Sequence, residues 1–273
     1  MNVLPPTREN VNIWTRDNAD DWTERGARQL TARTLQQLID NYIPYIRFRL
    51  VSETACHEMG QRLAELAFGS YRAVEPRIDR IGCTVFEYNA VGAEDYFAAS
   101  KVAAELRDRI FAQTFDPLQM VIRELSKRTG RRASIAENSK GQRYYAGLIR
   151  RIELGTELHI DFAPGEQSGW SVCEVQNQLT WNLYVKVGRS GSGRTTIYRR
   201  QWQPRDALLR EGSYGFSHKA VAGSEYVTFQ PHVGEVVFFN TRNYHIVDPS
   251  FGDRITVCSA IGETRSGDLI LWS

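Results

Sequence analysis

The chain has 273 residues, of which 42% are hydrophobic and 24% are charged, as is usual for a globular protein that buries a sizeable core. The net charge is only +2 and the arginines are dispersed, which excludes the concentrated basic surface of a nucleic-acid-binding protein. The N-terminus lacks the apolar run of a secretory signal, and no stretch approaches the length of a membrane span. We therefore expect a cytoplasmic protein with a small-molecule substrate, no nucleic-acid or membrane partner, and a monomeric or homodimeric state.

The four cysteines are widely scattered and form no C-x-x-C pair. The sequence therefore indicates neither a zinc knuckle nor a disulfide framework. Free, buried thiols are the expected state of Cys56, Cys83, Cys173 and Cys258.

The first part of the chain predicts an arm, a helix, a strand and a second helix. Residues 1–25 are polar and include a Pro-Pro pair, which predicts an extended arm. Residues 31–42 have the apolar spacing of a helix, and residues 43–50 have the composition of a strand. Ser52 then provides an N-cap for the second helix, which ends near Gly69.

Two longer helices are expected next. Residues 81–89 predict a strand, and residues 95–115 predict a helix. Asp116 and Pro117 supply an N-cap and a first-turn proline for another helix, which Gly130 stops. The polar stretch that follows is expected to be a loop at the edge of a lid. The apolar stripe of the helix over 95–115 consists of Phe97, Val102, Leu106 and Ile110.

From residue 143 onward, short β-rich runs alternate with Gly, Pro, Asn and Asp, which is typical of a β-sandwich or barrel. Eight runs suffice for a double-stranded β-helix, the jelly-roll or cupin-like fold. We therefore expect one α+β domain over 1–273, in which a mainly helical part with a lid, 1–142, buttresses a jelly-roll core, 143–273. The glycine-rich stretch 188–193 is expected to be a hairpin turn. The eight runs are 144–152, 157–162, 179–187, 195–200, 226–229, 235–240, 245–247 and 254–261.

One of these runs carries the first candidate metal ligands, His159 and Asp161. On an extended strand, side chains at i and i+2 point to the same face, roughly 6.6 Å apart. A second histidine, His245, comes late in the chain, where the last strands of a jelly roll return to the early ones. Two histidines and one carboxylate form the facial triad that holds Fe(II) and leaves three cis positions open. His232 is a rival for the distal ligand, although it stands in a turn.

Arg254 follows His245 by nine residues and opens another strand-like run with Thr256 at i+2. On a strand these two side chains face the same way. A guanidinium fork and a hydroxyl can therefore hold one carboxylate together, a geometry that suits arginine better than lysine.

The order H-x-D, a distant histidine and R-x-T resembles the motif of the Fe(II)/2-oxoglutarate-dependent oxygenases, over roughly residues 144–261. The resemblance implies that His159, Asp161 and His245 ligate iron. It also implies that Arg254 and Thr256 hold the C5 carboxylate of 2-oxoglutarate, that O₂ is the second co-substrate, and that succinate and CO₂ are co-products.

Shorter segments are similar to the stand-alone N-acyl amino acid hydroxylases and carrier-independent alkaloid halogenases. The halogenases of this group have a small residue where Asp161 stands, which leaves a coordination position for chloride, so a carboxylate there favours hydroxylation. The resemblance implies a free small molecule as substrate, either an amino-acid derivative or a natural-product intermediate. The similar segments are Asp95-Tyr96-Phe97-Ala98, Leu148-Ile149-Arg150, Thr196-Ile197-Tyr198 with Trp202, and Trp272.

One position departs from a related pattern. Prolyl-hydroxylase-like relatives have a tyrosine that helps to bind the co-substrate where this chain has Ile152. Another residue must then take that role, and Tyr145, Arg150 and Trp181 are the candidates.

The sequence leaves the substrate contacts and the outcome of the reaction open. Arg143, Arg150 and Arg151 are candidates for pairing with a substrate carboxylate, and Tyr198 is a candidate for lining the substrate cavity. Desaturation, cyclisation or halogenation with the same cofactors is the enzymatic alternative. A metal-free β-sandwich binding protein is the non-enzymatic alternative.

Overall fold

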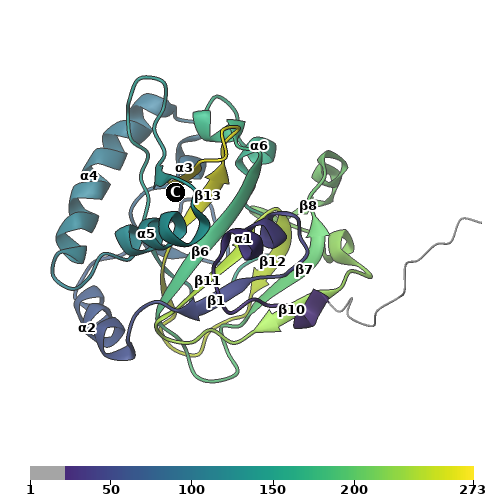
Figure 1. Cartoon of the computed structure of the whole chain (residues 1–273), viewed down its shortest axis with the longest axis horizontal. Helices are drawn as coiled ribbons and strands as arrows, with labels where there is room; N and C mark the ends of the chain where they lie inside the picture. Colours follow the sequence, from purple (N-terminus) through teal and green to yellow (C-terminus); the bar gives the residue numbers. More distant parts are fainter. Residues whose placement is uncertain (1–21) are drawn as a thin grey trace, which may run out of the picture.

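The computed structural model describes residues 22–273, so the arm expected over residues 1–25 lies almost wholly outside the described residues. In the described part, two mainly antiparallel sheets pack against each other, and helices cover the outer face of the larger sheet (Figure 1). This is the expected α+β fold with a jelly-roll core. Between residues 22 and 273, no helix has both the length and the apolarity needed to cross a membrane.

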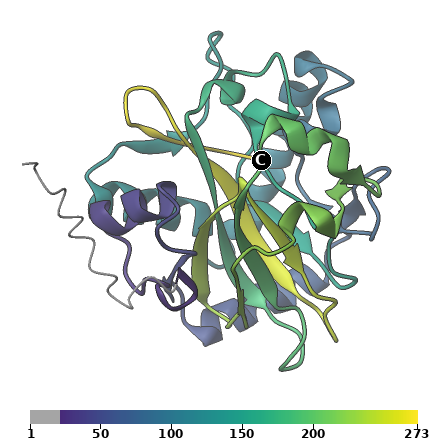
Figure 2. The same ribbon diagram turned by 90° about the vertical axis from the view of Figure 1, so that its right-hand side faces the viewer.

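The strands form a major sheet, a minor sheet and a short ribbon, and Figure 2 shows them from the side of the minor sheet. The major sheet has the order β1 (Ile46–Arg49), β11 (Glu235–Asn240), β6 (Asn177–Lys186), β13 (Ile255–Glu263), β5 (Leu148–Arg151), β3 (Asp79–Ile81) and β2 (Gly69–Ser70). Beyond this order, β14 (Leu269–Trp272) pairs with β13, and β4 (Ala133–Ile135) pairs with β14. The minor sheet has the order β10 (Tyr226–Phe229), β7 (Thr195–Gln201) and β12 (Asn243–Val247), and the ribbon consists of β8 (Arg210–Glu211) and β9 (Gly215–Phe216).

Most helices precede the jelly roll in the chain. The α-helices are α1 (Ala32–Ile39), α2 (Glu53–Ala64), α3 (Val85–Tyr88), α4 (Ala93–Phe111), α5 (Pro117–Thr129) and α6 (Ala163–Glu166). The 3₁₀ helices are η1 (Trp22–Glu24), η2 (Ser171–Glu174), η3 (Pro204–Leu209) and η4 (His218–Val221).

The helix boundaries follow the capping residues that the sequence offers. The side chain of Ser52 accepts a hydrogen bond from the N–H of Ala55 at the start of α2, and that of Asp116 accepts one from Gln119 at the start of α5. Gly130 ends α5 in the left-handed conformation, with φ of 71°, which glycine adopts without steric cost. The prediction of α5 is confirmed. The helix α2 begins as predicted but ends at Ala64, before the predicted end near Gly69, which belongs to β2.

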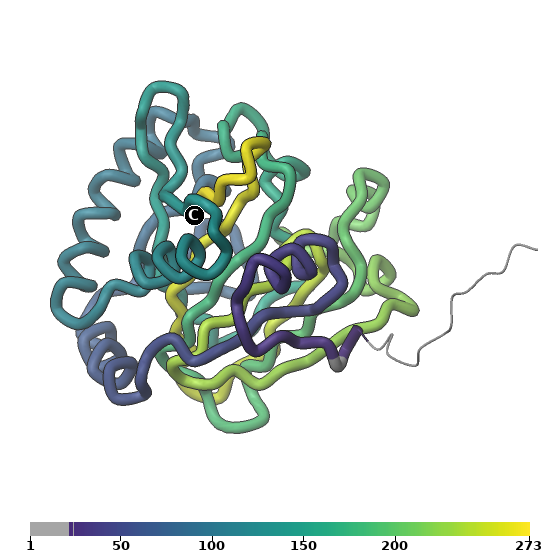
Figure 3. Tube along the Cα trace, in the orientation of Figure 1, coloured from purple at the N-terminus to yellow at the C-terminus, as the bar shows by residue number. Residues whose placement is uncertain are grey.

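The N-terminal half contributes strands as well as helices. Strand β1 pairs with the late strand β11, and in Figure 3 the purple N-terminal segment lies beside the yellow-green late segment. Strand β3 extends the sheet beyond β5. The major sheet therefore combines strands from both sides of residue 142.

The two faces of β6 bury different kinds of side chain. Leu179, Trp181 and Leu183 point towards α1, α2, α4 and α5 and form one core with them. On the opposite face, Thr180 and Asn182 point between the two sheets, because successive side chains of a strand alternate. The interior of the sandwich is therefore partly polar along this strand.

Trp181 belongs to the helix-facing core and is fully buried. It was a candidate for co-substrate binding, and the structure corrects this, because odd-numbered residues of β6 point away from the sandwich interior. We expect Trp181→Ala to lower the free energy of unfolding by about 3–5 kcal/mol through loss of packing. Chemical denaturation would measure this loss, and calorimetry should give an unchanged affinity for 2-oxoglutarate at a temperature where the variant is folded. A selective loss of that affinity would contradict the placement.

The strand predicted over 81–89 is wrong beyond its first residue. Gly82 has φ of +119°, which ends β3 because the extended conformation cannot continue through it. Thr84 then starts the short helix α3, where the Thr84 hydroxyl donates to a carboxylate oxygen of Glu87.

The apolar stripe predicted for α4 is also partly wrong. Val102 is 67% exposed and Leu106 is 37% exposed. The buried face instead contains Phe97, Ile110 and Phe111 together with two polar residues. The Tyr96 hydroxyl donates to the Ser273 carbonyl, and Arg107 donates to the Ala146 carbonyl.

The glycine-rich stretch 188–193 is not the tip of a hairpin. It joins β6 of the major sheet to β7 of the minor sheet, and these strands do not pair with each other. Spacing along the chain does not distinguish a turn within one sheet from a crossing between two sheets.

Candidate metal centre and cavity

The segment that carries His159 and Asp161 is extended but is not a regular strand. Only His159 pairs, in an isolated bridge with His245 of β12, and the two residues exchange both N–H···O hydrogen bonds at 2.9 Å. The Asp161 N–H donates to the Thr241 carbonyl. The predicted strand 157–162 is thus corrected to a single bridge, which still brings the two histidines side by side.

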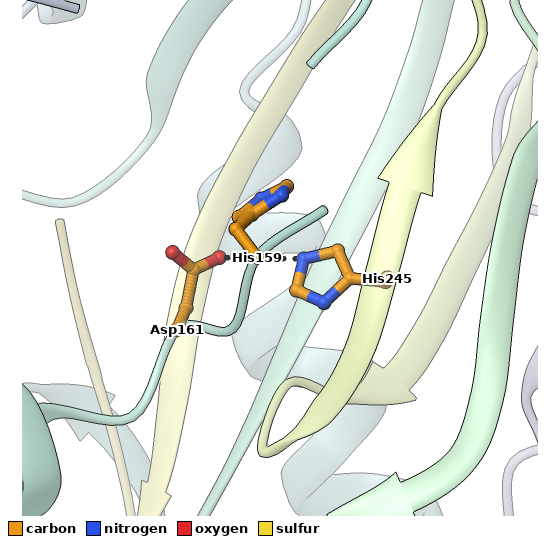
Figure 4. A group of neighbouring side chains, drawn as sticks. All are labelled: His159, Asp161 and His245. Carbon is orange, nitrogen blue, oxygen red and sulfur yellow. Dashed lines mark ion pairs between the residues drawn. The ribbon is translucent and has the colours of Figure 1, made fainter. Parts of the chain in front are cut away.

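Ligand atoms of His159, Asp161 and His245 lie within 4.8 Å of one another. The Nε2 atom of His245 is 3.7 Å from Oδ2 of Asp161, and the carboxylate and this imidazole point towards each other (Figure 4). The histidine rings lie 4.1 Å apart between centroids. His245 lies on an edge strand of the minor sheet.

Backbone carbonyls orient both imidazoles. Nδ1 of His159 lies 2.8 Å from the Glu157 carbonyl, and Nδ1 of His245 lies 2.9 Å from the Asn243 carbonyl. A carbonyl oxygen only accepts hydrogen bonds, so both Nδ1 atoms carry the proton and both Nε2 atoms keep a lone pair. This second hydrogen bond is the usual device that fixes the tautomer of a metal-binding histidine.

Electrostatics keep two of the three groups in the protonation states that bind a cation. Burial, together with the neighbouring His245, lowers the pKa of His159 to about 3, so its imidazole is neutral at physiological pH. Burial acts to raise the pKa of Asp161, yet the two imidazoles and the Arg150 guanidinium hold it below its usual range. Two imidazoles oriented by carbonyls and an ionised carboxylate are a donor set that fits Fe(II).

Arg254 and Thr256 lie at the start of β13, facing the sandwich interior. Arg254 is 3% exposed, donates to the Gly193 carbonyl at 3.2 Å, and forms no ion pair with any carboxylate of residues 22–273. Its burial lowers the pKa of the guanidinium. The Thr256 hydroxyl is buried without a hydrogen-bond partner in the described chain. An unpaired cation beside an unpaired hydroxyl fits a carboxylate of 2-oxoglutarate.

A cavity opens beside the three candidate ligands. His159, Asp161 and Arg150 form part of its wall. The apolar part of its wall includes Val74, Ile78, Val85, Phe86, Ile160 and Phe162.

Three residues predicted to contact ligands lie elsewhere. Tyr145 is fully buried in an aromatic cluster, where its hydroxyl donates to the Gly147 carbonyl. Tyr198 packs with Tyr226 on the outer face of the minor sheet, because its neighbour Ile197 points inward. Arg143 is exposed and paired with Glu137. The structure corrects these three expectations, and of the candidate arginines Arg150 alone lines the cavity.

Several cavity residues were not identified from the sequence. Gln178 and Thr180 of β6 line it, as do Cys258 of β13, Glu166 of α6 and Tyr214. The alternation of β6 was a usable signal for the first two, because polar residues stand at every second position of an otherwise apolar strand. Glu166 comes from the four-residue helix α6 and Tyr214 from the connection between β8 and β9, and both segments are too short for periodicity to give a signal.

A jelly roll that brings two histidines and a carboxylate together is the architecture of the 2-oxoglutarate-dependent non-haem iron oxygenases, the class to which this chain belongs. The family model described as carrier-protein-independent halogenase WelO5 matches residues 55–272. The chain is a member of that family.

Two curated relatives are similar in sequence. The L-gamma-glutamyl-L-propargylglycine hydroxylase of Streptantibioticus cattleyicolor is 35% identical over 163 residues, which are 59% of this chain and 60% of that protein. The Leucinostatins biosynthesis cluster protein S of Purpureocillium lilacinum is 31% identical over 216 residues, which are 73% of this chain and 87% of that protein.

A solved structure shows the same fold. The N-substituted L-amino acid dioxygenase from Burkholderia ambifaria superposes with a TM-score of 0.63, covering 89% of this chain and 91% of that one, at 14% identity. A second structure of that dioxygenase is a complex with alpha-KG and superposes equally well. At this identity the likeness concerns the fold alone.

Proposed function

We propose that this protein is an Fe(II)- and 2-oxoglutarate-dependent hydroxylase of a free small molecule, either an amino-acid derivative or a natural-product intermediate. One observation carries the proposal: two imidazoles with free Nε2 atoms and an ionised carboxylate converge at a cavity wall. The name of the Streptantibioticus relative, a hydroxylase of a glutamyl dipeptide derivative, supports this reaction and substrate class.

In the proposed mechanism His159, Asp161 and His245 hold the iron, and Arg254 with Thr256 holds the far carboxylate of 2-oxoglutarate. The loaded centre supplies the oxidation of an unactivated C–H by O₂, with succinate and CO₂ as co-products. The carbonyls of Glu157 and Asn243 fix the imidazoles. The apolar wall excludes water from the bound substrate, and no separate acid or base is needed.

Halogenation is the second candidate, because the family model is that of a halogenase. Asp161 argues against it. An ionised carboxylate in this position takes the coordination place that a small residue leaves open for chloride in the halogenases. Hydroxylation is therefore the outcome that we propose, with desaturation and cyclisation as variants of the same chemistry.

Succinate release tests the proposal. The purified protein is given iron, 2-oxoglutarate, O₂, chloride and a panel of N-substituted amino acids, and succinate and product mass are followed. We expect succinate formation that requires iron and product heavier by one oxygen atom. Iron-independent succinate would contradict the metal centre, and a product with the chlorine isotope pattern would establish the halogenase alternative.

A further inference from the structure

Arg150 is a partly buried cation without an ion-pair partner. Among the residues that line the cavity, all within the described part of the chain, it is the only arginine or lysine. Its Nη2 donates to the Asn182 carboxamide at 3.3 Å, and its buried Nε has no hydrogen-bond partner. No carboxylate of residues 22–273 lies within ion-pair distance. A guanidinium in this state retains the desolvation cost of burial without the compensation of a salt bridge.

The neighbouring titratable groups do not supply the missing negative charge. Burial raises the pKa of Tyr71, and it raises the pKa of Tyr214 to about 12, so both phenols stay neutral. The hydroxyl of Tyr214 accepts from the Glu157 N–H and keeps its own proton for donation. Burial likewise raises the pKa of Cys258, which remains a thiol.

Glu166, the other acidic side chain in the cavity wall besides Asp161, already has a cation. Its Oε1 accepts from Arg210 at 2.9 Å, and its Oε2 accepts from the Phe162 N–H at 3.1 Å. Burial raises the pKa of Glu166 to about 7. In neither protonation state does it offset the charge of Arg150.

The charges of the loaded site leave one cation uncompensated. This count rests on the proposed function, in which iron (+2) and 2-oxoglutarate (−2) cancel. Asp161 then supplies one negative charge against the two guanidiniums of Arg150 and Arg254, so one positive charge remains, and Arg254 is already assigned to 2-oxoglutarate. A buried excess of one positive charge is costly unless an anion enters, and the substrate is the remaining component of the complex.

We infer that the substrate of this protein carries a carboxylate and that Arg150 binds it. A planar guanidinium matches a carboxylate through two parallel N–H···O bonds, and the Tyr71 and Tyr214 hydroxyls line the same cavity as further donors. The rest of the substrate faces Val74, Ile78 and Val85, which favours an aliphatic side chain. Arg150 is thus a specificity-determining residue.

Binding without turnover tests this inference. The anaerobic protein, saturated with Fe(II) and 2-oxoglutarate, is titrated in a calorimeter with N-acetyl-L-leucine and with its neutral amide, and then with acetate and acetamide. We expect each acid to bind roughly 10- to 100-fold more tightly than its amide, as a charge-assisted hydrogen-bonded pair implies. No saturable binding of either acid, or equal binding of acid and amide, would overturn the inference.

Substitutions of Arg150 and of a control arginine test whether Arg150 is the cation that binds the carboxylate. Arg150→Gln should abolish the preference for acid over amide, Arg150→Lys should retain part of it, and the exposed control Arg143→Gln should retain all of it. If Arg150→Gln keeps the preference and loses 2-oxoglutarate binding instead, Arg150 serves the co-substrate and the inference is wrong. Chloride that displaces N-acetyl-L-leucine as readily as acetate does would also overturn it.

A different result would contradict the proposed function itself. Succinate is measured separately with O₂, so a protein that binds acids selectively but releases no succinate keeps the anion site and loses the oxygenase assignment.

Discussion

Replacing His245 with alanine is expected to weaken Fe(II) binding by more than about 100-fold. Removing a residue that only hydrogen-bonds to a metal ligand already costs up to about 100-fold in metal affinity, and here a ligand itself is removed. The bridge with His159 is made by the backbone, so the strand pairing survives the change. The lost Nε2 atom leaves one imidazole and one carboxylate, which no longer form a facial triad. Anaerobic metal titration measures the affinity, and succinate formation should fall with it.

The matched control is His57→Ala. His57 lies on α2, outside the metal cluster, where its ring bonds to Gln61, so metal affinity should not change. Thermal melting of the metal-free proteins tests whether His245→Ala is folded. A folded His245→Ala variant that binds Fe(II) as tightly as the parent protein would refute the assignment of the metal centre.

The second large effect concerns Arg254. Arg254→Met is expected to weaken 2-oxoglutarate binding by roughly 10- to 100-fold, since hydrogen bonds to charged groups contribute about 1.5–3 kcal/mol. Arg254→Lys keeps the charge but loses the fork, so it should recover only part of the affinity. Calorimetry on the anaerobic iron-loaded protein measures both variants.

The free energy of unfolding of the Arg254→Met variant provides a second, independent test of the role of Arg254. In the protein without co-substrate this guanidinium is buried and has no carboxylate partner in residues 22–273, so methionine should preserve or raise the free energy of unfolding. Arg199→Met, which breaks an exposed ion pair with Glu225, serves as the control and should leave co-substrate affinity unchanged. Unchanged affinity in Arg254→Met would show that another group holds the co-substrate.

The sequence was sufficient to predict the helix ends and most strands, because these features depend on residues that are neighbours in the chain. The caps at Ser52 and Asp116 and the stop at Gly130 act within one helical turn, and the structure has all three. Most strands of the jelly roll were also predicted, because apolar β-branched runs between turn residues have few other structures available.

The errors arose where a distant partner decides the local structure. The buried face of α4 includes Tyr96 and Arg107, which donate to backbone carbonyls, and neither carbonyl is near them in sequence. The orientation of Trp181 depends on which face of β6 the helices cover, since alternation alone does not say which face is which.

The sequence alone was enough to recognise the H-x-D pair, the distant His245 and the Arg254–Thr256 pair as a set, because the chemistry of iron and carboxylate binding restricts the residue types. The folded chain decides that Arg150 lines the cavity while Arg143, Tyr145 and Tyr198 do not. Cavity walls are assembled from strands and loops far apart in the chain. Which side chain faces the cavity therefore depends on strand register and sheet packing, and neither is set by nearest neighbours.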